Sequence, residues 1–263
     1  MKTLAIARFC WALFRTNLRS VTALRGSFLL SMTFMALNNT TFFVFWWLLF
    51  GRIGSLRGWH VQDVELLFGI SAAGFGLMQA TLGGAMHLAR FVDDGSLEPM
   101  MVQPKPTLLY ALGCRSQASG FGDMASGFVF MILSGYVSWS DAPRALLCVL
   151  VSCVAFTAVC VALGSLAFWI KKSETLSRQL LDIVITFSLY PEPLFDGGLK
   201  LLLFTLVPAG FVSYLPAEVV RGAGPVALCL MLGGCALLCA ASLRVFRAGL
   251  RRYAGGSRFG VFG

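Results

Sequence analysis

Charged residues are scarce in this chain. Only 13% of its 263 residues are Asp, Glu, Lys or Arg, whereas a soluble domain usually carries about 25%. Hydrophobic residues make up 57% of the sequence, and the mean hydropathy is +0.79. This balance excludes a water-soluble globule, because so much apolar surface needs lipid to cover it.

Several motifs of catalysis and metal binding are also missing. The dipeptide Gly-Lys does not occur, which excludes a Walker-type phosphate-binding loop. The motif H-E-x-x-H is absent, and the two histidines, His60 and His87, lie in separate predicted loops. None of the eight cysteines belongs to a C-x-x-C pair. We therefore predict no metal site and no disulfide framework.

Long runs without a charged side chain divide the sequence. They cover residues 26–51, 66–86, 124–140, 145–170, 201–217 and 222–243. A membrane-spanning helix needs about 20 apolar residues. Four of the runs are long enough, and 124–140 becomes so when it extends back over Phe121 and Gly122.

The region between the fourth and last of these spans is interrupted. Residues 176–190 are apolar except for Arg178, Gln179 and Asp182, and we predict a fifth span there. Prolines follow, and a proline removes a hydrogen bond from a helix and clashes with the preceding turn. We expect residues 191–222 to form short helices that re-enter the outer leaflet. The predicted fold is an all-α integral membrane protein with six transmembrane helices.

The distribution of Lys and Arg predicts the orientation. With six spans, 16 of the 21 basic residues fall on the side of the two termini. The exceptions are Arg52, Arg57, Arg144, Lys200 and Arg221. Positive residues favour the cytoplasmic side, so both termini are predicted to be cytoplasmic. A seventh span over 201–217 would export the C-terminal arginines, which disfavours it.

The first 25 residues combine basic and apolar positions. Arg8, Arg15 and Arg19 fall on one helical face, and Phe9 and Leu13 fall on another. Residues 1–25 are therefore predicted to form an amphipathic helix in the cytoplasmic interface. A simple basic leader before the first span is the alternative. No A-x-A-like cleavage site follows, so a secretory signal is excluded.

Four consecutive polar residues, Asn38, Asn39, Thr40 and Thr41, interrupt the middle of the first span. They point in all directions around a helix, and polar groups facing lipid are costly. They either line a translocation path or form hydrogen bonds between helices.

Small residues recur every four positions along the second span, at Ala72, Gly76, Ala80 and Gly84. Such a stripe lets helix backbones approach closely in lipid. It predicts either a seam between two chains or ordinary packing inside one chain.

One string is typical of catalysis. Gly120-Phe121-Gly122-Asp123 matches the G-x-G-D string of intramembrane aspartyl proteases. Those enzymes need a second aspartate, for which Asp182 is the candidate. The alternative is that Asp123 caps the cytoplasmic entry to the third span.

The predicted cytoplasmic loop at residues 87–107 mixes charges, turn residues and apolar side chains. Asp93-Asp94-Gly95 predicts a turn, and the two prolines near its end stop any helix. This composition suits docking on a protein partner, with a solvated connector as the alternative.

Five short strings resemble, in order, the signatures of ABC-2-type permeases, the membrane subunits of type-2 ABC exporters. They are Gly58-Trp59 with Asp63, residues 94–98 with Gln103-Pro104, residues 187–191, residues 208–211 and residues 214–217. Gln103 replaces the arginine that usually precedes Pro104 in the family. The resemblance is to the bacterial subfamily of roughly 260 residues that is encoded beside a separate ATPase.

This resemblance implies a single transmembrane permease domain over residues 1–263 in a bacterial inner membrane. The chain would form the substrate path and would not itself be an enzyme. Its partners would be an ATPase dimer, membrane lipid and a second permease, a different but similar chain or otherwise a second copy, with no nucleic acid. No cofactor is expected in this chain, since ATP and Mg would bind to the ATPase.

The resemblance also implies roles by position. The candidates for coupling to the ATPase are Asp93, Asp94, Gly95, Leu97 and Glu98 in the loop, Arg15 and Arg19 in the N-terminal helix, and Lys171, Lys172, Glu174 and Arg178 in a second contact. The candidates for an extracytoplasmic lid are Tyr190, Pro191, Pro208 and Pro216.

Two other functions stay open: a self-sufficient channel or secondary carrier, and an intramembrane protease. Carriers usually show inverted repeats, which this sequence lacks. The clear spans carry no charge well inside them, which favours a hydrophobic or amphipathic drug, lipid or peptide-like substrate over a small ion.

Overall fold

The computed structural model describes residues 2–195, 197–205 and 207–257, and among these every regular element is helical. Met1 and residues 258–263 of the predicted domain lie outside the described residues. They include Arg258, one of the basic residues predicted to be cytoplasmic.

Four helical stretches are long and apolar enough to cross a membrane: Arg25–Ile53, Val61–Asp93, Ala142–Phe168 and Pro225–Tyr253. The first is helix α2 (Arg25–Ile53). The second joins α3 (Val61–Leu82), the 3-10 turn η1 (Gly83–His87) and α4 (Leu88–Asp93), and the third joins α8 (Ala142–Gly164) to η2 (Ser165–Phe168). The fourth belongs to α12 (Pro225–Ser257).

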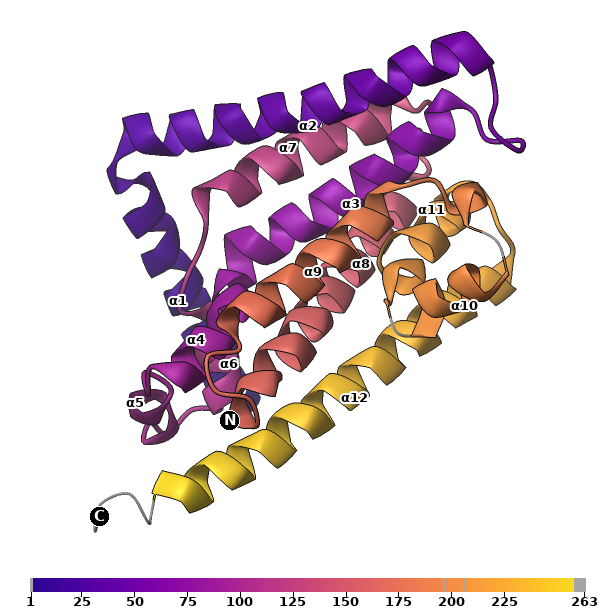
Figure 1. The fold of residues 1–263 in the computed structure, drawn as a ribbon. Helices are drawn as coiled ribbons and strands as arrows, with labels where there is room; N and C mark the ends of the chain where they lie inside the picture. The colour runs from indigo at the N-terminus through magenta and orange to yellow at the C-terminus, as the bar shows by residue number, and fades with distance from the viewer. Residues whose placement is uncertain (1, 196, 206, 258–263) are drawn as a thin grey trace.

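The other two predicted spans form shorter helices. These are α7 (Ala118–Leu133) and α9 (Glu174–Leu189). Each has 16 residues and is therefore about 24 Å long, less than the roughly 30 Å of a hydrocarbon core. Both run alongside the long helices (Figure 1). Six crossings thus remain a prediction, with four of them in long apolar helices.

The helices pack in a definite order. α7 lies between α2 and α3, α8 packs on the other side of α3, and α12 lies along α8 at the edge opposite α2 (Figure 1). The apolar stretches of α3 and α8 are 78% and 67% buried, whereas those of α2 and α12 are only 11% and 17% buried. α3 and α8 therefore form the core, and the two edge helices present apolar side chains to their surroundings.

The crossing of α3 and α7 depends on small residues. A Cβ at Gly76 would meet the backbone of Gly120 and Met124, and a Cβ at Gly127 would meet the backbone of Gly69 and Ala73. Because no side chain separates the two backbones at these points, α3 and α7 approach one another closely.

One end of the bundle gathers the N-terminal helix and several short helices. α1 (Lys2–Ala23), α4, α5 (Glu98–Met101) and α6 (Thr107–Gly113) lie there, together with the last turns of α12 (Figure 1). Asn17 Nδ2 donates a hydrogen bond to the carbonyl of Gly113 at 2.5 Å, and the ring of Phe9 stacks on Tyr110. These contacts tie α1 to α6.

The opposite end carries the proline-broken segment. Between α9 and α12 the chain forms η3 (Glu192–Leu194), α10 (Gly198–Thr205), the π-helical turn η4 (Gly210–Tyr214) and α11 (Leu215–Val220). η4 and α11 pack on α3 and α8, and the hydroxyl of Tyr214 donates to the carbonyl of Phe187 at 2.6 Å. Positions 196 and 206 of the predicted segment 191–222 lie outside the described residues.

Candidate functional site

The predicted coupling loop is largely helical. Its residues form α4, a turn and α5, and Gly95 occupies the turn with a φ of +77°. The carboxylate of Asp94 accepts hydrogen bonds from the Ser96 hydroxyl at 2.6 Å and the Ser96 amide at 2.9 Å. These two hydrogen bonds lower the pKa of Asp94, and the bond from the hydroxyl has the larger effect. The turn is thus held by its own side chains, in the manner of an Asx turn.

Two of the predicted coupling regions touch each other. The Asp93 carboxylate accepts a hydrogen bond from the backbone amide of Lys172 at 3.0 Å. The carboxylate of Glu98 accepts one from the hydroxyl of Tyr253 at 3.3 Å. The loop after α4, the loop before α9 and the end of α12 therefore meet at the same end of the molecule.

The remaining charged coupling candidates are accessible. Lys171 and Lys172 are exposed, and Glu174 pairs with Arg178 at 2.9 Å within the first turns of α9. Arg15 and Arg19 are exposed on α1. None of these side chains is needed to fill the core, so all are free to contact another chain.

Leu97 requires a correction. Its side chain is 0% exposed, and its amide donates to the carbonyl of Phe91, so it anchors the turn. A side chain buried in this way cannot contact a docked ATPase. The apolar residue that is available there is Val102, which is 87% exposed. The sequence pattern did not separate the two, because both lie in a short, irregular segment.

The four consecutive polar residues of α2 have different environments. Asn38, Thr40 and Thr41 are exposed, and the two threonine hydroxyls donate back to the carbonyls of Ala36 and Leu37. Asn39 is 5% exposed and points into the bundle. Asn39 therefore joins helices together, while Asn38, Thr40 and Thr41 lie on the outer surface of the chain.

Asn39 belongs to a buried polar cluster around Asp123. Its amide donates to Asp123 Oδ1 and to Ser126 Oγ, both at 2.8 Å, and Gln79 Nε2 donates to Asp123 Oδ2 at 2.9 Å. Asp123 is 3% exposed. The carboxylate thereby connects α2, α3 and α7 through two amide side chains.

This cluster is unsuited to aspartyl protease chemistry. Both oxygens of Asp123 are engaged by amide donors, and Asp182 is exposed on α9. No hydrogen bond joins the two carboxylates within the described chain, whereas a catalytic dyad shares a proton between them. Nor does any group of three His, Cys, Asp or Glu residues there gather to hold a metal ion.

The small-residue stripe lies inside the chain. Ala72, Gly76 and Ala80 are buried in α3, and Gly84 lies in the following turn η1. A Cβ at Gly84 would meet the carbonyls of Ala111 and Leu112 in α6. The stripe therefore serves the contacts of α3 and η1 with α7 and α6 of the same chain.

α9 carries a polar face that points away from the bundle. Its buried positions are Ser177, Leu181, Val184 and Ser188. Its exposed polar positions are Thr175, Gln179, Asp182 and Thr186, spaced four, three and four residues apart, and we call these four residues the α9 polar face. The spacing places them along one side of the helix.

The predicted lid residues pack at the end opposite α5. Tyr190 contacts the rings of Phe42 and Trp46, with ring centroids 6.1 and 5.6 Å apart. The side chains of Pro191, Pro208 and Pro216 are buried, and Pro216 lies in the first turn of α11. Tyr190 directly follows α9, so these ring contacts join α2 to the end of α9.

Sequence reasoning missed an ion pair at this end. Asp63 is 2% exposed and pairs with Arg221, whose guanidinium also lies 5.1 Å from the ring centre of Trp59. The hydroxyl of Tyr136 donates to Asp63 at 2.8 Å. Burial, followed by this bond, raises the pKa of Tyr136. A signal was present, because Arg221 is one of the five basic residues on the side poor in positive charge.

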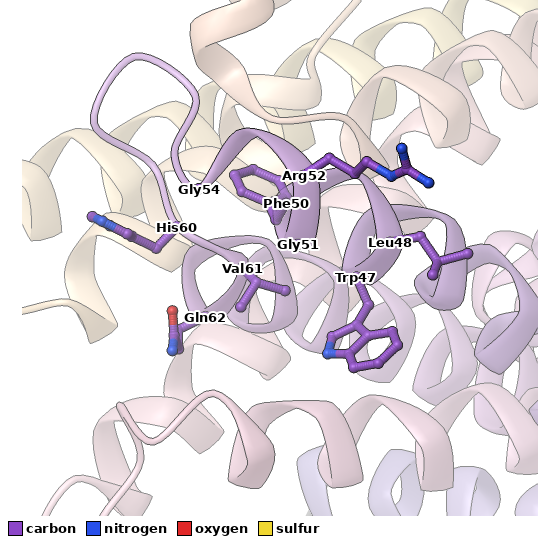
Figure 2. A pocket seen from close by; sticks show the side chains of 9 residues that line it. All are labelled: Trp47, Leu48, Phe50, Gly51, Arg52, Gly54, His60, Val61 and Gln62. Atoms are coloured by element: carbon purple, nitrogen blue, oxygen red, sulfur yellow. The ribbon is translucent and has the colours of Figure 1, made fainter.

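An open pocket of about 550 Å³ lies where α2 turns back into α3. Figure 2 shows side chains of both helix ends around it, among them Trp47, Arg52 and His60. The pocket is shallow and shares no residue with the α9 polar face.

The fold defines a multi-pass helical membrane protein with polar ends. Residues 36–257 match the family described as ABC-2 family transporter protein. The chain belongs to this family, which is one of membrane transport components, as its short sequence strings predicted. No curated protein and no solved structure matched the chain.

Proposed function

We propose that this chain is the permease subunit of an ATP-driven exporter that pairs with a second permease and docks on a separate ATPase dimer. The family membership, which covers residues 36–257, carries this proposal. The sequence supports it, because a chain without a Walker-type loop needs another subunit to hydrolyse ATP.

The contacts at the end that holds α5 support docking there. Asp93 joins the first predicted coupling region to Lys172 in the second, and Glu98 joins α5 to Tyr253 in α12. A force applied to α5 would therefore reach α4, α9 and α12 together. The basic side chains on this end favour the cytoplasmic side of a bacterial inner membrane.

The α9 polar face supports a path between two permease chains. Placing this row of polar side chains, which includes the carboxylate of Asp182, in contact with lipid would cost free energy. The polar side chains would be hydrated if two permeases paired with these faces toward a shared aqueous space. The exposed Asn38 of α2 is a further candidate for lining that space. The proline-broken segment would close this space from the outside.

Purification from gentle detergent tests the proposal. The tagged chain should bring down a Walker-motif ATPase in a fixed ratio, together with a second permease if the pair is heteromeric. A chain that purifies alone, under conditions that keep a known membrane complex intact, would overturn the proposal and favour a self-sufficient channel or carrier.

A further inference from the structure

α9 turns a row of polar side chains outward, in addition to exposed Leu176 and Ile183. The row carries an amide, a carboxylate and two hydroxyls, while Leu181 and Val184 are buried. A peripheral membrane helix would normally turn apolar side chains outward, as α2 and α12 do here. Something other than lipid must therefore cover or hydrate the α9 polar face.

Asp182 is the charge that lies farthest along α9. It follows Glu174 by eight residues, or about 12 Å of helix, and no charged residue comes after it before the helix ends at Leu189. Arg178, the nearest cation in the helix, is already paired with Glu174 at 2.9 Å. Within the described chain, the bond that involves Asp182 is donated by Thr186 to its backbone carbonyl and leaves the carboxylate unoccupied.

The surroundings of this carboxylate are both apolar and polar. Ile183, the next residue, is 43% exposed, and Leu176, about 9 Å earlier along the helix, is 40% exposed. Gln179 and Thr186 lie one turn away on either side. A ligand that rests here meets a negative charge flanked by aliphatic surface. That combination is complementary to a positive charge on an apolar body, since an anion would be repelled and a neutral molecule would leave the charge uncompensated.

We propose that Asp182 on the α9 polar face is a binding subsite for the positive group of a cationic, amphipathic export substrate. This inference rests on the proposed function, because it places the subsite in the path between two permeases. In a pair of identical chains, two such carboxylates would border the path and repel each other, and a cationic ligand between them would relieve that repulsion. With a different second permease, this chain would supply one half of the subsite.

Three probes of matched shape test the charge preference. Tetraphenylphosphonium is a lipophilic cation, tetraphenylborate is an anion of nearly the same size, and tetraphenylmethane is the neutral counterpart. The protein is used as it purifies, with its partner subunits. Equilibrium binding of each radiolabelled probe is measured in a separate sample, because the cation and the anion form an insoluble salt when mixed. The cation should bind and should be displaced by unlabelled cation, and neither the anion nor the neutral molecule should show such binding.

Substitutions at position 182 test whether the carboxylate itself, rather than another part of α9, binds the cation. Asp182→Asn should weaken binding of the cation by about tenfold, the size of effect expected for one charge contact, and Asp182→Glu should restore most of it. Asp141→Asn, the same change at the half-buried N-cap position of α8, should leave binding unchanged. Thermal unfolding of each variant shows whether it folds.

The outcomes distinguish this inference from the proposed function. If an ATPase accompanies the chain but Asp182→Asn binds the cation as well as the unchanged protein does, the subsite is refuted and the exporter stands. If no ATPase accompanies the chain, the exporter fails, and cation binding that depends on Asp182 still supports the subsite. If Asp182→Asn changes only the recovery of the second permease, the α9 polar face is a contact between chains, and the subsite is refuted.

Discussion

The carboxylate of Asp63 lies 3.1 Å from Nε of Arg221 and joins the start of α3 to the end of α11. The same carboxylate oxygen accepts a hydrogen bond from Tyr136, in the loop after α7. A third bond, from the backbone amide of His60 to the other oxygen, caps α3. One buried charge thus holds together segments that are far apart in the sequence.

Arg221→Ala should destabilise the protein substantially. Removing the guanidinium leaves the 2% exposed carboxylate of Asp63 without its cation, which costs about 2–4 kcal/mol when the partly exposed Arg221 is taken into account. Thermal unfolding in detergent measures the effect. The matched control is Arg144→Ala, because Arg144 pairs with Asp141 at an exposed site at 3.7 Å and should lose less than about 1 kcal/mol. Equal effects of the two substitutions would contradict a structural role for the buried pair.

Asp123→Leu should be more destabilising than Asp123→Asn. Leucine accepts no hydrogen bond and leaves the amide donors of Asn39 and Gln79 unsatisfied, at about 1–3 kcal/mol for each. Asparagine keeps one acceptor and a similar shape. Unfolding temperatures of the two variants check the order. If Asp123→Asn instead abolishes transport while the unfolding temperature stays the same, Asp123 acts in the path and its role is more than structural.

Gly76→Ala should loosen the contact of α3 with α7. The added methyl group would meet the backbone of Gly120 and Met124, which cannot move aside as a side chain can, and overpacking of this kind costs about 1–3 kcal/mol. Gly233→Ala in α12 is the matched control, since a Cβ there meets nothing within 4 Å and alanine favours a helix by about 1 kcal/mol. The two changes should therefore have opposite signs in a thermal unfolding series.

Glu98→Lys should lower the stimulation of the partner ATPase without unfolding the permease. Glu98 is exposed on α5, so reversing its charge alters a docking surface and leaves the core intact. Tyr253→Phe serves as the comparison, because it removes the hydrogen bond to Glu98 while keeping the charge. ATP turnover of the purified complex distinguishes the two, and unchanged turnover in Glu98→Lys would refute the role of Glu98 in coupling.

The long helices could be predicted because their signal is local. The charge-free run 26–51 falls within α2, the run 145–170 coincides with the α8–η2 stretch to within three residues at either end, and the run 222–243 begins three residues before α12. The prolines after Tyr190 mark the short helices that follow. The charge-free run 124–140 extends beyond its helix, because α7 ends at Leu133 and a turn follows, in which Gly135 has a φ of +72°. Hydropathy does not register such a turn when its residues are uncharged.

The environments of the candidate site residues were less predictable, because they depend on which helix faces pack against one another. Asn38 and Asn39 are identical side chains at adjacent positions, yet one is exposed and the other binds Asp123. Leu97 had the composition of a docking residue and is buried. The small-residue stripe showed that two helices approach closely, and the fold was needed to show that the second helix is α7 of the same chain.

Leu24 alone separates α1 from α2, so any change in the angle between the two helices must occur at this residue or at the helix ends beside it. At its other contacts α1 is fixed to α6, because Asn17 donates a hydrogen bond to the carbonyl of Gly113 and Phe9 stacks on Tyr110. A tilt of α2 would therefore either change the backbone torsions at Leu24 or displace α1 and α6 together.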